Sequence, residues 1–329
     1  MRPYLFSFSF LIIALLVSLA IGSVFLPLQD IFAVIQGNGS DLATNILWNI
    51  RLPRTVLIAL TGMALGGSGA AYQGLFRNPL ADPYLIGIAS GAGLGAVIAM
   101  SFDRAFSFWG LMAIPLTAFI FALLTVAIVY FLARVGRTAP ITNLLLAGVA
   151  VSSFTTSLMS FIMLRTDGEL RRAMSWLMGG SIQLGWEFVA TILPYLLIGL
   201  GALLFSGHVL NLLQFGDEQA QQLGLNVSRA KTILLIMASM ATAAAVSFAG
   251  IIGFVGLIVP HVMRLWFGAD YRKLVPLSIL CGASALLFSD VIARVVLAPQ
   301  ELPVGVVTAL AGAPFFLWVL RRSKTQGLW

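Results

Sequence analysis

Long apolar runs separated by short polar segments dominate the 329-residue chain. Nine runs are long enough to cross a hydrocarbon layer of about 30 Å, and they lie near residues 5–26, 54–75, 84–101, 107–133, 141–164, 188–206, 231–252, 275–297 and 304–320. A membrane β-barrel would instead show segments of about ten residues with alternating polarity. The pattern therefore predicts an all-α integral membrane protein.

The segment from Lys231 to Phe267 is too long for a single span. As one helix, its 37 residues would measure about 55 Å, so the segment must fold back on itself. The residues that would break it are Gly250, Gly253, Gly256 and Pro260. We therefore expect a short tenth helix near residues 254–266.

The 19 lysines and arginines divide unevenly between the two sides of a ten-helix arrangement. One side holds Arg2, Arg77, Arg134, Arg137, Arg229, Lys231, Arg264, Arg272, Lys273, Arg321, Arg322 and Lys324. The other side holds Arg51, Arg54, Arg104, Arg165, Arg171, Arg172 and Arg294. Because cationic loops remain in the cytoplasm, the first side is expected to be the inner one, with both chain termini on it.

Composition agrees with a lipid environment: 60% of the residues are hydrophobic and 9% are charged, against about 25% charged in ordinary soluble domains. The net charge of +7 is scattered between apolar runs, so nucleic-acid binding is not indicated. Cys281 is the single cysteine, which excludes an internal disulfide framework and a cysteine metal cluster. The run from Leu5 to Phe25 is interpreted as a retained helix, and residues 1–329 as one transmembrane permease domain.

A polar, amphipathic segment near residues 214–225 lies in the longest inner loop. Its first turn is acidic, two apolar residues share a face, and a glycine ends it; these residues are Asp217, Glu218, Ala220, Leu223 and Gly224. A short helix on the inner surface is suited to dock a cytoplasmic partner. The alternative is a plain surface helix.

Two arginines flank a proline in Arg51-Leu52-Pro53-Arg54, at the outer end of the second predicted helix. They are expected to form a rigid pair of outward charges for acidic groups of an external partner. The alternative is that they extend toward lipid headgroups. Arg294 is the other arginine at an outer helix end without an adjacent acid.

The inner loop from Arg77 to Pro83 contains two prolines that fix its shape, and Asn78 can close a turn on its own backbone. A rigid loop of this kind beside a pore could gate it.

Asp290 and Glu187 lie near helix ends, and no carboxylate falls clearly at mid-membrane, which counts against a proton- or sodium-coupled carrier. His261 is interpreted as a structural hydrogen-bonding residue.

The sequence has no G-x-x-x-x-G-K-[ST] motif, so the chain has no P-loop and any ATP drive needs a second polypeptide. Two histidines without an H-E-x-x-H motif offer no catalytic site and no metal site. We therefore expect a chain that is not an enzyme and that holds no cofactor of its own.

Taken together, the motifs resemble the FecCD-type permeases of ATP-binding-cassette importers for iron-siderophores, haem and vitamin B12. The matching segments, in order along the chain, are Arg51–Arg54, Gly74–Gly87, Leu144–Gly148, Trp176–Ser181, Ala220–Gly224, Gly253–Arg264, Glu301–Gly305 and Gly312–Pro314. Each segment alone is weakly specific, and the ordered set is highly specific.

The resemblance implies ten helices per subunit and a homodimer around one central pathway in a bacterial or archaeal inner membrane. It also implies two cytoplasmic ABC ATPase subunits, which bind ATP and Mg, and an outer substrate-binding protein. Arg51, Arg54 and Arg294 match arginines that pair with glutamates of the binding protein, and residues 217–225 match the helices that couple the permease to the ATPase.

The inner constrictions of the pathway match Asn78, Pro79 and Leu80 in one segment and Ile141, Thr142 and Asn143 in the other. The helix expected at 141–164, which is rich in serine and threonine, resembles the helix that lines the pathway. The leading hypothesis is a permease subunit of an ATP-driven importer that works by alternating access. Its cargo would be an iron-siderophore, haem or cobalamin. The alternative is an ion-coupled secondary transporter or a channel that works without an ATPase.

Overall fold

The computed structural model describes residues 2–22, 27–101, 108–136, 139–165, 170–180 and 185–325, and these residues form helices joined by turns and loops. Seven helical segments are long and apolar enough to cross a membrane. They are α1 (Arg2–Ala20), Asp41–Leu75, the part of α6 (Phe108–Ala133) from Met112, α7 (Ile141–Arg165), α9 (Trp186–Phe205), α12 (Val227–Ala249) and α14 (Tyr271–Val295). Three shorter apolar segments are α5 (Ile88–Ser101), α13 (Val255–Phe267) and Val304–Val319 within α15 (Val304–Thr325).

Each of the ten helices predicted from the apolar runs has a counterpart in the described residues. The segment Asp41–Leu75 is continuous and consists of α3 (Asp41–Asn45), a π-helical stretch η1 (Ile46–Arg51) and α4 (Leu52–Leu75). Some predicted boundaries shift by several residues: α1 ends at Ala20 rather than near residue 26, and α12 begins at Val227 rather than near Lys231. The Asn226 side chain caps this helix by accepting a hydrogen bond from the Arg229 amide at 3.1 Å, so polar residues enter its first turn.

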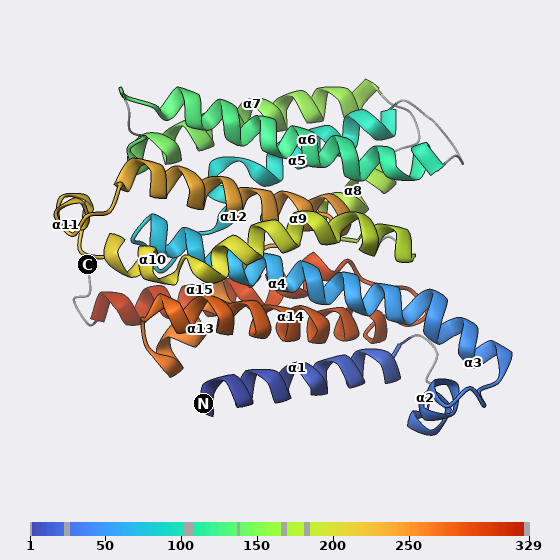
Figure 1. Ribbon diagram of the computed structural model, residues 1–329. Helices are drawn as coiled ribbons and strands as arrows, with labels where there is room; N and C mark the ends of the chain where they lie inside the picture. The colour runs from blue at the N-terminus through green and yellow to red at the C-terminus, as the bar shows by residue number, and fades with distance from the viewer. Residues whose placement is uncertain are drawn as a thin grey trace.

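Several further helices are too short to appear as apolar runs. They are α2 (Leu28–Ile35), the 3₁₀ turn η2 (Pro83–Ile86), α8 (Leu170–Leu177), α10 (Gly207–Leu213) and α11 (Asp217–Gln222). The start of α1, the end of α15 and α11 lie at one end of the bundle, while α2 and α3 lie at the opposite end (Figure 1). The segments expected on the inner surface therefore lie at one end of the molecule, and those expected on the outer surface lie at the other.

The centre of the bundle is the crossing of α4 with α14, which make the most extensive helix contact. A Cβ atom added at Gly62 or Gly66 would collide with the backbone carbonyl of Gly282 or Ser278, respectively. The two backbones therefore touch directly. Close approach through small residues is how helices associate in lipid, where no hydrophobic force drives apolar surfaces together.

The predicted break after α12 is confirmed, but its residues were only partly identified. The chain leaves α12 at Gly250, with φ +78°, and enters α13 at Val255 after Phe254, with φ +69°. The expectation that Gly256 and Pro260 belong to the break is wrong, because both lie inside α13. Pro260 lies in the second turn of α13, where it removes one intrahelical hydrogen bond without ending the helix.

Replacing Gly66 by Ala is expected to lower the free energy of unfolding by about 1–3 kcal/mol, because the new methyl group must push α14 away from α4. The measurement is thermal unfolding of the purified full-length chain in detergent. Gly201→Ala in α9 is the matched control, because a Cβ atom at Gly201 meets nothing within 4 Å. Equal unfolding temperatures for the two variants would contradict the close crossing.

Candidate functional site

The predicted amphipathic segment forms the short helix α11, preceded by α10. Asp217 and Glu218 occupy its first turn, as expected for a helix N-terminus. It ends at Gly224, where φ is +89° and the Leu225 amide donates to the Ala220 carbonyl at 3.0 Å. This hydrogen bond and the left-handed glycine are those of a Schellman end, so the predicted helix and its terminator are confirmed.

Only part of the predicted apolar face of α11 is buried. Ala220 is fully buried, whereas 62% of Leu223 is exposed. Leu223 is the residue that ends the helix, at the edge of the contact that buries Ala220. Of the two apolar residues predicted to share a face, Ala220 is thus buried, and Leu223 remains available to a second molecule.

An ion pair connects α11 to the first turns of α12. The Lys231 Nζ lies 2.6 Å from the Asp217 Oδ2, with 19% and 49% of the two side chains exposed. One turn of helix is thereby fixed against a long apolar helix, although a partly exposed pair of this kind stabilises by only about 1 kcal/mol. Close by, the Tyr130 and Thr232 hydroxyl groups share a hydrogen bond of 3.0 Å, which joins α6 to α12.

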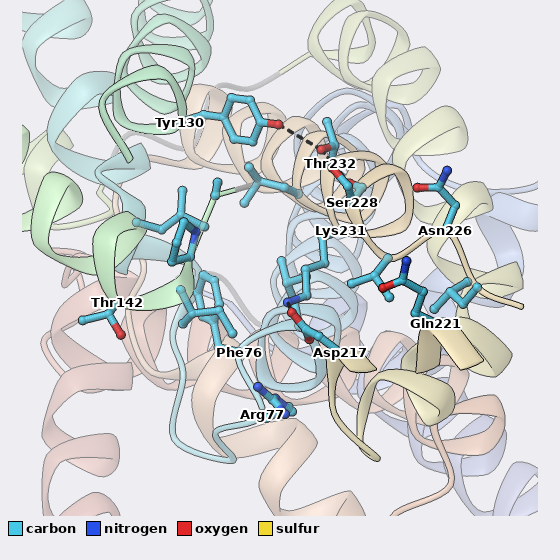
Figure 2. A pocket seen from close by; sticks show the side chains of 18 of the residues that line it. Phe76, Arg77, Tyr130, Thr142, Asp217, Gln221, Asn226, Ser228, Lys231 and Thr232 are labelled. Carbon is cyan, nitrogen blue, oxygen red and sulfur yellow. Dashed lines mark hydrogen bonds and ion pairs between the residues drawn. The ribbon is translucent and has the colours of Figure 1, made fainter. Parts of the chain in front are cut away.

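A cavity of about 620 Å³ lies beside this ion pair, at the α11 end of the bundle. Its wall includes residues from α11, the start of α12, the ends of α6 and α4, and the start of α7. Figure 2 shows Lys231 and Asp217 pointing toward one another, with Arg77 beyond them and the Tyr130–Thr232 pair on the opposite side. The lining is amphipathic and carries both signs of charge.

This cavity brings together residues from two predicted sites that are far apart in the sequence. Asp217 and Glu218 belong to the expected coupling segment, and Ile141 and Thr142 to the expected gate. The remaining predicted residues at this end of the bundle lie outside its lining; they are Asn78, Pro79, Leu80, Asn143, Ala220, Leu223 and Gly224. Of these, Asn143 directs its amide toward the Ala133 carbonyl at 3.5 Å.

The loop after α4 has the rigid shape that its prolines and Asn78 predict. The Asn78 Oδ1 accepts a hydrogen bond from the Leu80 amide at 2.9 Å, and the Asp82 Oδ1 accepts one from the Tyr84 amide at 2.8 Å. The Tyr84 hydroxyl then donates to the Ile252 carbonyl at 2.9 Å. This bond attaches the loop to the break between α12 and α13.

At the opposite end of the bundle, the three predicted outer arginines lie close together, and two of them pair with one carboxylate. The Arg54 Nη2 lies 2.9 Å from the Asp290 Oδ1, and the Arg54 Nη1 lies 2.7 Å from the Glu301 Oε2. The Arg294 Nε lies 3.0 Å from the Asp290 Oδ2. Arg51 donates to the carbonyl groups of Leu19 and Ala20, the second at 2.9 Å.

This geometry corrects the expectation of free outward charges. Only 5% of Arg51 and 4% of Arg294 is exposed, so both lie within the protein. Arg294 also has an adjacent acid, because Asp290 stands one helical turn before it in α14. The i,i+4 spacing in the sequence is the pattern that could have revealed this pair. Arg54, bonded to the more exposed Glu301, is the arginine of the three nearest the surface.

Other predicted features take structural roles. Cys281 is buried, and its thiol lies 3.3 Å from the Ser7 hydroxyl. Across the described ranges, no group of three histidine, cysteine, aspartate or glutamate side chains could hold a metal ion. Ser181 of the Trp176–Ser181 motif and the loop cations Arg104 and Arg137 lie outside the described residues.

The fold and these two ends define a class of protein: a multi-span membrane protein with its polar sites at the helix ends. The profile of the FecCD transport family matches residues 10–322, and the chain belongs to this family. It is thus a transmembrane permease of the ABC transport class, and the resemblance noted in the motifs is confirmed.

Two relatives and one solved structure cover nearly the whole fold. The hemin transport system permease HmuU of Yersinia pestis is 41% identical over 324 residues, covering 96% of this chain and 95% of that protein. The cobalamin import system permease BtuC of Halobacterium salinarum is 44% identical over 296 residues, covering 90% and 79%. A metal-chelate type ABC transporter solved in an inward-facing conformation superposes with a TM-score of 0.83 at 29% identity, covering 97% and 98%.

Replacing Asp82 by Asn tests the electrostatics of the loop after α4. Burial raises the pKa of the Asp82 carboxyl group to about 6, partly offset by the hydrogen bond from the Tyr84 amide. A raised pKa means that ionisation costs folding free energy, so the wild-type chain should lose stability between about pH 4 and pH 6.

The Asp82→Asn variant keeps an oxygen acceptor for the Tyr84 amide and carries no charge at this position. It should therefore match wild type near pH 4 and gain about 3 kcal/mol over it above pH 7. Thermal unfolding of both proteins in detergent from pH 4 to pH 8 measures this difference. A difference that stays constant across that range would contradict the burial of an ionised carboxylate.

Proposed function

We propose that this chain is the permease subunit of an ATP-driven importer that moves a metal chelate or a corrinoid into the cytoplasm by alternating access. Haem and cobalamin are the substrates in the names of HmuU and BtuC, and a metal chelate is the substrate class of the solved relative. All three belong to one chemical class, a bulky chelated metal, and an iron-siderophore belongs to it as well.

The observation that carries this proposal is the convergence of two segments on one cavity. Asp217 and Glu218 come from α11, and Ile141 and Thr142 come from the start of α7. A cytoplasmic ATPase that moves α11 would change the wall that α11 shares with α7, and so the access to the pathway from inside. The ATPase, with its bound ATP and Mg, is a partner of this chain in the proposal, because the sequence has no P-loop.

A second copy of the chain is the proposed partner along α7. In the isolated chain α7 is an apolar helix that is mostly exposed. It nevertheless exposes hydroxyl groups on Ser153, Ser157 and Ser160, each of which donates to the carbonyl group four residues earlier at 2.9 Å. Hydroxyls on an exposed membrane helix are better suited to a polar pathway between two subunits than to lipid.

The proposed topology has ten membrane helices with both termini in the cytoplasm of a bacterial or archaeal cell. The common location of the α1 start and the α15 end in Figure 1 supports an even number of crossings. The outer end then carries Arg51, Arg54 and Arg294, where a substrate-binding protein would dock. An acidic group of that protein would bind Arg54 first, by displacing the carboxylate of Glu301. The Glu301 side chain is 39% exposed and therefore accessible to a partner.

Replacing Leu223 by Arg tests the coupling role of α11. Because Leu223 is exposed, the variant should fold, and a charge at the contact with the ATPase should lower ATP-dependent uptake about tenfold or more. The measurement uses the purified chain in proteoliposomes with its ATPase and binding protein, and it records ATP hydrolysis and substrate uptake together. Gly224→Arg is a harsher second variant, since φ there is +89°.

Leu42→Arg is the matched control, because Leu42 is also an exposed leucine but lies at the opposite end of the bundle, in α3. It should leave ATP hydrolysis unchanged. Unaltered uptake by Leu223→Arg would refute the coupling role. Uptake by the chain alone, in vesicles without any ATPase, would instead support a secondary transporter or a channel.

A further inference from the structure

A set of hydrogen bonds connects α10, which directly precedes α11, to the last turn of α4, which directly precedes the loop at Asn78. The Gln214 Nε2 donates to the Gly74 carbonyl at 3.0 Å and to the Leu210 carbonyl, also at 3.0 Å. Since Gly74 precedes Asn78 by four residues, a single side chain spans the distance between the two predicted functional segments.

A second connection starts from Asn211 in α10. Its Nδ2 donates to the Asp270 Oδ1 at 2.7 Å, and its Oδ1 accepts from the Tyr271 amide at 2.9 Å. Hydrogen bonds from Arg272 and from Asn211 lower the pKa of Asp270, so this acceptor stays ionised. Asn211 therefore fixes α10 to the first turn of α14 through both ends of its amide group.

Tyr271 continues the connection toward α4. Its hydroxyl accepts from the Arg264 Nη2 at 3.0 Å, and the same nitrogen donates to the Gln73 Oε1 at 3.0 Å. Gln73 is fully buried, and its Nε2 donates to the Leu257 carbonyl at 3.0 Å. Its backbone carbonyl accepts from the Asn78 amide at 3.1 Å. The route thus ends on the first residue of the predicted gate.

We infer that Asn211, Tyr271, Arg264 and Gln73, together with Gln214, are positioning residues that transmit movement of α11 to the loop of residues 78–80. This inference rests on the proposed transport function and names the route by which the ATPase side would act on the gate. Each member joins its own element to a second one, and a buried amide such as that of Gln73 is costly to leave unpaired. The connected elements therefore move together or exchange partners together.

The bonding of Arg264 suits an element with two arrangements. Two neutral oxygens accept from its Nη2, so the guanidinium group can change partners without leaving a carboxylate buried and unpaired. The Arg264 Nε is buried and has no hydrogen-bond partner in the described part of the chain. A second arrangement of α13 and α4 in which Nε gains an acceptor would recover that bond.

The test compares two tyrosines that each lose one buried hydroxyl bond. Tyr271→Phe removes the acceptor of Arg264, whereas Tyr72→Phe removes the 2.7 Å bond to Ser239, which lies off the route. In proteoliposomes with the ATPase and binding protein, Tyr271→Phe should lower the substrate transported per ATP hydrolysed by about fivefold. Tyr72→Phe should leave that ratio at the wild-type value.

Amide hydrogen exchange distinguishes a loss of transmitted movement between α11 and the loop from a loss of stability of the fold. In wild type, ATP should change the exchange of the amides of residues 76–82 and of α11 together. In Tyr271→Phe the α11 amides should still respond to ATP, while those of residues 76–82 should not. Gln214→Met, which changes an exposed side chain and so leaves the fold intact, should weaken the same response.

If wild type transports substrate and the two tyrosine variants transport equal amounts of substrate per ATP hydrolysed, the proposed route is refuted. The proposed function is then unaffected. A wild-type complex that shows no ATP-driven uptake would overturn the proposed function itself. A loss of coupling in both tyrosine variants, with matching losses of thermal stability, would assign the route a purely structural role and refute the inference.

Discussion

The contact on which the structure depends is the direct backbone approach of α4 to α14. In lipid, helix association relies on close packing and on polar contacts, and the glycines at this crossing allow both backbones to touch. The crossing fixes the position of α4 along its whole length. Because α4 begins at the outer arginines and ends at the Asn78 loop, one rigid helix relates the two polar ends of the molecule.

Charge is handled differently at these two ends. At the end that carries the predicted outer arginines, Asp290 has no exposed surface and is paired with Arg54 and Arg294, which compensates the cost of burying its charge. At the α11 end, Arg264 is held by the neutral oxygens of Gln73 and Tyr271. A carboxylate shared by two guanidinium groups favours a single arrangement, whereas neutral acceptors can be exchanged. The Asp290 cluster is therefore suited to hold one fixed arrangement, and the Arg264 cluster is suited to movement.

The sequence was sufficient to predict the elements that depend on residues close together in the chain. Apolar run length predicted ten helices, the acidic turn and Gly224 predicted α11, and Asn78 with two prolines predicted a rigid loop. It was not sufficient where the outcome depends on neighbours distant in the chain. The burial of Arg51 against the Leu19 and Ala20 carbonyls depends on how α1 packs, and no periodicity within residues 51–54 contains that information. The i,i+4 pair of Asp290 and Arg294 was local and readable.

The break between α12 and α13 connects the packing of the bundle to the loop at Asn78. A folded-back segment in lipid must pair its free backbone groups with something other than water. Here the Ile252 carbonyl is paired with the Tyr84 hydroxyl, which follows directly after the Asn78 loop. Pairing of the free backbone groups, which the fold-back before α13 requires, therefore attaches the break to that loop. Arg264, on α13, bonds Gln73 on the other flank of the loop, so the break contacts one side of the loop region and α13 the other.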